Sequence, residues 1–181
     1  AMRSLGLCDL SGLTKLGIKG SGAATWLAKQ QVDVPDEIYH SRRLDDHGVV
    51  IQCARDEFFL ESGIANDSVP SLSDRLDSSD EEIWKVQRQD ATFFLIGSRA
   101  VQVLAQTCGV DFSRVTPHTL VLTRVAGTSC GVFADPVGNV SAYRIWVDST
   151  YANYLWETLV QISSELDGHV VGAGCIYPEL R

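Results

Sequence analysis

Residues 127–131 (Gly-Thr-Ser-Cys-Gly) match the Gly-x-Ser-x-Gly pattern of a nucleophilic serine. That pattern is catalytic where a sharp turn from a strand into a helix exposes the serine beside a histidine and an acid. Here a second β-rich run follows the turn, and nothing in the sequence places His118 or His169 beside Ser129. The segment therefore predicts a hairpin and not a nucleophile.

A second candidate is the Gly-Ser-Gly turn at residues 20–22, which precedes an expected helix as in a dinucleotide-binding motif. The acidic pair Asp45-Asp46 follows at about the distance of that motif's ribose-binding carboxylate. The third glycine position is Thr25, however, and the preceding strand alternates polar and apolar residues, unlike a parallel strand buried on both faces. We therefore interpret the turn as structural, without a bound nucleotide.

Neither the histidines nor the cysteines have the spacing of a metal site. No two histidines lie three or four residues apart, no cysteines form a Cys-x-x-Cys pair, and 23 acidic residues single out no acid–base couple. The sequence thus indicates no catalytic, cofactor-binding or metal-binding residue, and the cysteines are expected to be reduced and mostly buried. The histidines of the sequence are His40, His47, His118 and His169, and the cysteines are Cys8, Cys53, Cys108, Cys130 and Cys175.

Composition excludes further classes of protein. Of the 181 residues, 45% are hydrophobic and 21% are charged, as in a globular protein that folds without disulfides or metal. The net charge of −8 opposes binding to phosphate backbones and anionic lipids, so neither nucleic acid nor a membrane is an expected partner. No apolar run reaches the roughly 18 residues of a membrane span, and no charged segment followed by an apolar run suggests a secretory signal. A cytoplasmic location is therefore expected.

The sequence also contains a weak internal repeat. Residues 15–28 and 92–105 each predict a strand, a Gly-Ser turn and a short helix with apolar residues at helical spacing. The alignment pairs Gly20 with Gly97 and Leu27 with Leu104, and both leucines are expected to be buried.

Each half continues with β-rich runs separated by turn residues and ends in a helix. The expected strands are 49–53 and 58–62 in the first half, and 119–125, 130–134 and 142–148 in the second. The expected helices are 71–76 and 151–166, the latter capped by Ser149-Thr150. Each half is thus a β-α-β-β-α unit. We predict a single bilobal α+β domain over residues 1–181, with pseudo-repeats over about 5–76 and 84–166 and antiparallel-rich sheets covered by helices.

The last expected helix is apolar on more than one side. One apolar stripe suits packing on the domain's own sheet and consists of Tyr151, Ala152, Leu155, Leu159 and Ile162. Tyr154, Trp156 and Val160 lie outside this stripe and are candidates for a partner interface. The alternative is that Trp156 packs under a loop of the same chain.

Five segments, which together span about residues 5 to 166, follow one another in the order and at the spacing found in a known family. They are residues 7–20 (Leu-Cys-Asp-Leu-Ser-Gly-Leu, then Gly-Ile-Lys-Gly), 55–60, 108–112, 123–127 and 147–156. These segments resemble the folate-binding, aminomethyltransferase-like domain of the glycine-cleavage T-protein and its relatives. Within that superfamily, the chain resembles the gamma subunits of heterotetrameric sarcosine oxidases more closely than it resembles the T-protein.

The resemblance implies a bilobal fold and a flavin-dependent complex that oxidises an N-methyl amino acid. It implies that larger partner subunits carry the FAD, FMN, NAD and tetrahydrofolate sites, and that this chain is a structural subunit. We expect no cofactor in the chain and no activity from the chain alone.

Departures from the T-protein pattern agree with that expectation. The T-protein has an acidic residue in the segment that corresponds to residues 48–52, which here is Gly-Val-Val-Ile-Gln. A pterin-binding glutamate is also missing from the turn at residues 135–139 (Asp-Pro-Val-Gly-Asn). From the end of the sequence at Arg181 we expect no C-terminal barrel domain. The alternative hypotheses are a stand-alone folate-binding one-carbon protein and a scaffold without a ligand.

Overall fold

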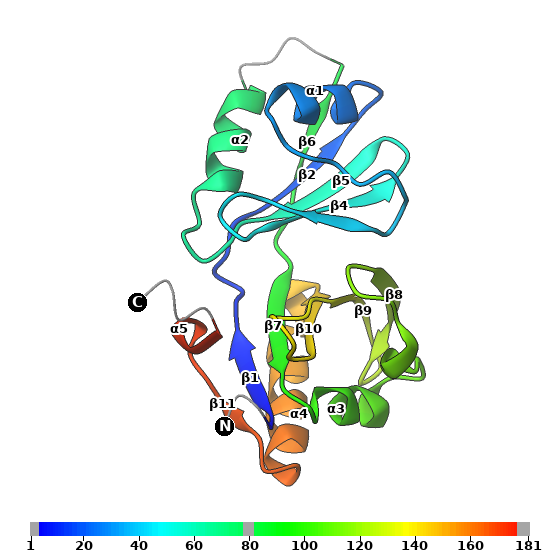
Figure 1. The fold of residues 1–181 in the computed structure, drawn as a ribbon, viewed down its shortest axis with the longest axis vertical. Coiled ribbons are helices and arrows are strands. Elements are labelled where there is room, and N and C mark those ends of the chain that lie inside the picture. Colours follow the sequence, from blue (N-terminus) through cyan, green and yellow to red (C-terminus); the bar gives the residue numbers. More distant parts are fainter. Residues whose placement is uncertain (1–3, 78–81, 177–181) are drawn as a thin grey trace. The chain divides into compact units, whose positions relative to one another are not determined.

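The computed structural model describes residues 4–77 and 82–176, which form two compact units (Figure 1). We call Leu13–Gln89 the central unit and Ala1–Gly12 with Asp90–Arg181 the terminal unit. Each unit contains one mostly antiparallel sheet with helices against one face. The predicted α+β class with antiparallel-rich sheets is therefore confirmed.

The terminal unit has a six-stranded sheet of order β11-β1-β7-β10-β9-β8. β1 and β11 are parallel, and all other neighbours are antiparallel. The strands are β1 (Gly6–Asp9), β7 (Ala91–Ile96), β8 (Leu120–Val125), β9 (Thr128–Ala134), β10 (Ala142–Val147) and β11 (His169–Val170). The helices are α3 (Ala100–Thr107), α4 (Ala152–Glu165) and α5 (Ala173–Ile176), with 3-10 turns η1 (Phe112–Arg114) and η2 (Ser149–Tyr151).

The central unit has a five-stranded antiparallel sheet of order β3-β4-β5-β2-β6. Its strands are β2 (Lys15–Lys19), β3 (Ser41–Arg43), β4 (Val49–Ala54), β5 (Glu57–Glu61) and β6 (Trp84–Gln87). Its helices are α1 (Ala23–Lys29) and α2 (Ser68–Asp77). Leu16, Ile18 and Leu60 alternate onto the face against which both helices pack.

The two units repeat the same connectivity. β2-α1-β3-β4-β5-α2 corresponds to β7-α3-β8-β9-β10-α4, and the matching strands have the same order in their sheets. Each repeat thus has three strands between its two helices, one more than the expected β-α-β-β-α unit. In the first half β3 was not predicted, whereas β8, β9 and β10 of the second half correspond to the expected strands 119–125, 130–134 and 142–148. Further strands complete each sheet: β6 lies beside β2 at the edge of the central sheet, and β1 lies beside β7 with β11 at the edge of the terminal sheet.

Gly20 and Gly97 occupy corresponding turns, as the repeat predicts. Their φ angles are +135° and +120°, a region that L side chains rarely adopt. A Cβ would meet the carbonyl oxygen of Glu82 at Gly20 and that of Ser4 at Gly97. Each glycine carbonyl accepts a 3.0 Å hydrogen bond from the first residue of the following helix. Leu27 and Leu104 are fully buried in those helices, which confirms this part of the sequence analysis.

The start of the last helix differs from its prediction. The side chain of Asp148, and not Ser149 or Thr150, accepts hydrogen bonds from the Thr150 N–H at 2.9 Å and its hydroxyl at 2.6 Å. Asp148 thereby caps η2, and α4 begins one turn later at Ala152. An aspartate accepts such bonds well because its carboxylate reaches the free N–H groups at a helix start.

Candidate functional site

The buried face of α4 is centred on Leu155, Leu159 and Ser163. Tyr151, which we placed in the buried stripe, is 54% exposed, so that assignment was wrong. The inner face is rotated toward Trp156 because η2 occupies the residues before Ala152 and directs Tyr151 outward.

Trp156 and Val160 flank the buried face and pack against the core of the terminal unit. Both are half-buried, and the Trp156 ring centroid lies 5.2 Å from that of Phe93. Tyr154 is on the outer side and is 54% exposed. The predicted residues therefore do not form one continuous apolar patch: two line the edge of the core and one faces outward.

The hydroxyl of Tyr154 donates a 3.1 Å hydrogen bond to the carbonyl of Ala126. Ala126 and Gly127 form the two-residue turn between β8 and β9, with φ angles of 49° and 82°. The Ala126 N–H in turn donates to the carbonyl of Thr107 at 2.8 Å. Positive φ at both central residues is typical of a type I′ hairpin turn. Tyr154 thus fixes this hairpin to α4 while its ring remains accessible to a partner.

The segment at residues 127–131 is a hairpin, as predicted. Val125 pairs with Thr128 across the turn, and Ser129 lies in β9 opposite Arg124. Because a strand and not a helix follows the turn, Ser129 lacks the exposed elbow that a nucleophile requires.

Asp46 is a structural residue. Its Oδ1 accepts a 2.9 Å hydrogen bond from the Gly48 N–H, and its Oδ2 accepts bonds from the Gly63 N–H at 2.9 Å and the Ser68 hydroxyl at 2.6 Å. Ser68 begins α2, so the carboxylate joins the β3–β4 turn to the start of that helix. This role supports the interpretation that the pair Asp45-Asp46 does not hold a ribose.

A groove of about 590 Å³ lies beside Asp46 within the central unit. The end of α1, the β3–β4 turn and the first turns of α2 line it. Arg75 crosses one wall and donates hydrogen bonds to Gln30 at 3.2 Å and Ser71 at 3.0 Å. The groove has the volume of a small-molecule site, and both Arg75 and Asp46 make hydrogen bonds within the chain.

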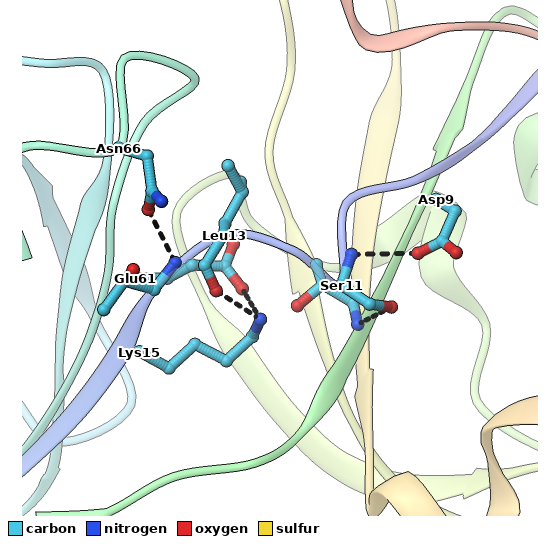
Figure 2. Close-up of polar contacts among 8 residues, drawn as sticks. Asp9, Ser11, Leu13, Lys15, Glu61 and Asn66 are labelled. Carbon is cyan, nitrogen blue, oxygen red and sulfur yellow. Dashed lines mark hydrogen bonds and ion pairs between the residues drawn. The ribbon is translucent and has the colours of Figure 1, made fainter.

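Local polar contacts hold Asp9, Ser11, Leu13 and Lys15 of the segment 7–20, which carries part of the resemblance (Figure 2). In the terminal unit, Asp9 accepts a 2.9 Å hydrogen bond from the Ser11 N–H. In the central unit, Lys15 donates to the carbonyl of Leu13 at 2.9 Å and lies 3.4 Å from the carboxylate of Glu61. Lys15 and Glu61 are both buried and are direct neighbours across β2 and β5. The opposite charges compensate each other for the loss of hydration, and loss of one partner would leave the other as an unpaired buried charge.

A second buried ion pair joins Arg144 and Asp135 at 3.0 Å. Asp135 opens the turn in which the resemblance would place a pterin-binding glutamate, and it is fully buried. The guanidinium of Arg144 also lies 5.6 Å from the ring centroid of Phe94. The acid at the start of this turn is therefore part of an internal ion pair.

The five cysteines are free, as expected, but only Cys8 and Cys130 are buried. Burial, with smaller effects of Asp9 and Cys175, raises the pKa of the Cys8 thiol from 9.0 to about 11. Burial also raises the pKa of Cys130. High thiol pKa values disfavour the reactive thiolate. Within residues 4–77 and 82–176, no group of three or more His, Cys, Asp or Glu side chains could hold a metal ion, and no helix has the length and apolar character to cross a membrane.

Comparison with known proteins agrees with this fold. The chain aligns with a crystal structure of the glycine cleavage system aminomethyltransferase T from Bartonella henselae at a TM-score of 0.71 and 16% identity. That match covers 94% of this chain but 48% of the aminomethyltransferase, so the chain spans about half the length of that protein. A chain of the heterotetrameric sarcosine oxidase from Corynebacterium sp. U-96, in complex with pyrrole 2-carboxylate, aligns at a TM-score of 0.75 and 20% identity, covering 92% of this chain and 87% of that one.

No curated protein matches the sequence. The family model described as the GCVT N-terminal domain matches residues 1–178, which is nearly the whole sequence. The chain therefore belongs to the GCVT N-terminal domain family.

Proposed function

We propose that this chain is a non-catalytic accessory subunit of a cytoplasmic, flavin-dependent heterotetrameric sarcosine oxidase, or of a related complex that oxidises another N-methyl amino acid. In this proposal the gamma subunit supplies structure, and larger flavoprotein subunits bind FAD, FMN, NAD and tetrahydrofolate. The similarity to a chain of the Corynebacterium enzyme over most of both lengths supports the proposal.

The ion pair of Asp135 and Arg144 is the observation that carries the proposal. In the related transferase, as the resemblance implies, an acid in this turn holds the pterin. Here Asp135 is buried beside Arg144 at 3.0 Å, so a folate would have to compete with an internal cation for the carboxylate. Breaking such a pair is costly, about 3–5 kcal/mol, because it leaves a buried charge without its partner. The segment at residues 48–52 offers no replacement acid.

Within this complex, Tyr154, Trp156 and Val160 remain the predicted partner interface. Tyr154 provides the exposed aromatic ring, and Trp156 and Val160 would contribute the part of their surfaces that the core leaves uncovered. Aromatic residues at the centre of an interface often dominate its binding energy.

Co-expression of the tagged chain with the flavoprotein subunits encoded beside it tests the proposal. We expect a complex that co-purifies with bound flavin and consumes oxygen when sarcosine or another N-methyl amino acid is added. The isolated chain should show neither flavin absorbance nor activity. Failure of the neighbouring subunits to co-purify under conditions in which all of them are soluble would contradict the accessory role.

The match to the aminomethyltransferase favours a second candidate, a folate-binding one-carbon protein. Tetrahydrofolate distinguishes the two, since a ligand at 100 times its dissociation constant adds about 2.7 kcal/mol to the free energy of unfolding. We expect no change in the melting temperature of the isolated chain. A clear rise in the melting temperature with tetrahydrofolate, and none with a pterin-free control ligand such as glutamate, would favour the folate-binding protein.

A further inference from the structure

β8 forms an open edge of the sheet in the terminal unit. It pairs with β9, and in the part of the chain that the structure describes no strand pairs with its other side. β8 has six residues, whereas the other described edge strands, β3, β6 and β11, have three, four and two. Natural sheets protect their edges by short strands, charges, prolines or bulges, because a free edge can pair with another chain. β8 has an unbroken register and no proline.

The register of the hairpin identifies the free backbone groups of β8. Val125 and Thr128 close the two-residue turn, so Val125, Thr123 and Val121 form the hydrogen-bonded pairs with β9. The N–H and C=O groups of the alternate residues, Leu120, Leu122 and Arg124, therefore point away from β9. These groups form three evenly spaced positions for an incoming strand.

The side chain at the middle position is apolar and exposed. Leu122 is 62% exposed, on the face opposite Val121 and Val125, which pack toward the helices. Leu120 and Leu122 both lie beside Gly131 of β9, where a Cβ would be 3.1 Å and 3.7 Å from them. A large apolar side chain at the centre of a free edge favours pairing over solvation.

We propose that β8 pairs with β8 of a second copy of this chain, antiparallel, with Leu122 on the two-fold axis. A two-fold interface requires a surface that is complementary to itself. With Leu122 opposite Leu122 of the second copy, Leu120 faces Arg124 on both sides of the axis. All outward backbone groups of the three positions then find partners, and the two Leu122 side chains meet across the axis on the same face.

The charge pattern of β8 agrees with this register and disfavours one centred on Arg124. Arg124 is the one charged residue of the strand. In the proposed register the two copies of Arg124 lie four positions apart along the pair, at about 3.4 Å per residue, so like charges do not face each other. A register centred on Arg124 would place the two guanidinium groups directly opposite, which is destabilising.

Pairing through one strand buries less surface than a permanent dimer requires. The dimer is thus expected to form reversibly as protein concentration rises. Analytical ultracentrifugation of the isolated chain over a wide concentration series measures this directly. We expect the weight-average mass to rise from that of the monomer toward twice that value.

Two variants test the strand. Leu122→Pro removes an N–H that points away from β9, and proline is tolerated at such edge positions, so the monomer should keep its melting temperature. Leu122→Lys places a charge on the axis. Both should remain monomeric throughout the series, while Tyr151→Lys, which charges another exposed residue outside β8, should dimerise like the unmodified chain. A monomeric unmodified chain, or a dimer that persists in both Leu122 variants, would overturn the proposal.

Amide hydrogen exchange provides an independent measurement. The amides of Leu122 and Arg124 should exchange more slowly at high protein concentration, whereas the exchange of Thr123, already bonded to β9, should change little. This proposal does not depend on the accessory-subunit proposal: loss of self-association in the Leu122 variants and loss of flavoprotein binding are separate measurements.

Discussion

Tyr39 and His118 have the same backbone geometry at corresponding positions of the two units. Their φ angles are 65° and 64°. Their N–H groups donate hydrogen bonds to the carbonyls of Gln52 and Ala134, at 2.7 Å and 2.8 Å. Each residue lies just before an edge strand, β3 or β8, and each acceptor lies in the neighbouring strand, β4 or β9. The repeat is thus preserved in backbone conformation where the side chains are unrelated.

The left-handed conformation of His118 predicts an unusual response to glycine. This conformation costs a residue with a Cβ roughly 1–2 kcal/mol, whereas glycine adopts it freely. His118→Gly should therefore leave the free energy of unfolding unchanged or raise it by up to about 1 kcal/mol, and His118→Val should lower it by about 1–2 kcal/mol. Urea denaturation measures both. Arg124→Gly, in the regular strand β8, is the control and should be destabilising; equal losses in the two glycine variants would contradict the role of φ.

The hydrogen bonds of Asp46 predict a contrast with its neighbour. Asp46→Ala removes the acceptor for Gly48, Gly63 and Ser68, and should lower the free energy of unfolding by about 1–3 kcal/mol. Asp45→Ala, at an exposed position, should change it by less than about 0.5 kcal/mol. Thermal denaturation of the two variants compares them directly, and similar melting temperatures would contradict the capping role.

Trp156 contacts Phe93, so its truncation should affect the monomer. Because Trp156 is half-buried, we expect Trp156→Ala to lower the free energy of unfolding of the isolated chain by about 1–3 kcal/mol. Tyr151→Ala, at an exposed site, is the matched control and should have little effect. An unchanged melting temperature for Trp156→Ala, together with weaker assembly with the flavoprotein subunits, would instead assign the side chain entirely to the interface.

The raised pKa of Cys8 predicts a loss of stability in alkali. The folded thiol has a pKa of about 11, above the ordinary value of 9.0, so folding disfavours the thiolate. The stabilising contribution is complete below pH 9 and is lost as the pH rises through 11. The melting temperature of Cys8→Ala, measured between pH 8 and 11 against that of the unmodified chain, should fall less steeply. Identical slopes would show that Cys8 has no such effect.

Particular residues explain how much of the fold the sequence predicts. Gly20 and Gly97 are visible in the repeat because positive φ beside a crowded backbone leaves little alternative to glycine. A positive φ is also required at Tyr39 and His118, but neither residue is glycine, and they lie at different distances from Gly20 and Gly97 in the sequence. The repeat is therefore not visible there in the sequence. The short strands β1, β3, β6 and β11 were not predicted, because such strands depend on their neighbours and not on their own residue pattern.

The candidate site was less predictable. Helical spacing alone placed Tyr151 on the buried face, since a preceding 3-10 turn does not alter the apolar pattern. Asp46 accepts a hydrogen bond from Gly63, which is distant in sequence, and Asp135 pairs with Arg144, which lies in β10. The residue pattern gives no indication of either contact. Pattern reasoning did succeed at Ser129, where the β-rich runs on both sides excluded a catalytic elbow.

The pairing of β1 with β7 also determines the order in which the chain can fold during synthesis. β1 ends at Asp9, but its partner begins at Ala91, and the whole central unit lies between them. At about 5–20 residues per second, β1 waits roughly 4–16 s on the ribosome before β7 is made. The central unit, a continuous stretch, is complete at Gln89 and can form its sheet first. β1 is therefore among the last strands to find its neighbours, and a nascent chain that stalls near residue 90 would expose β1 to other chains.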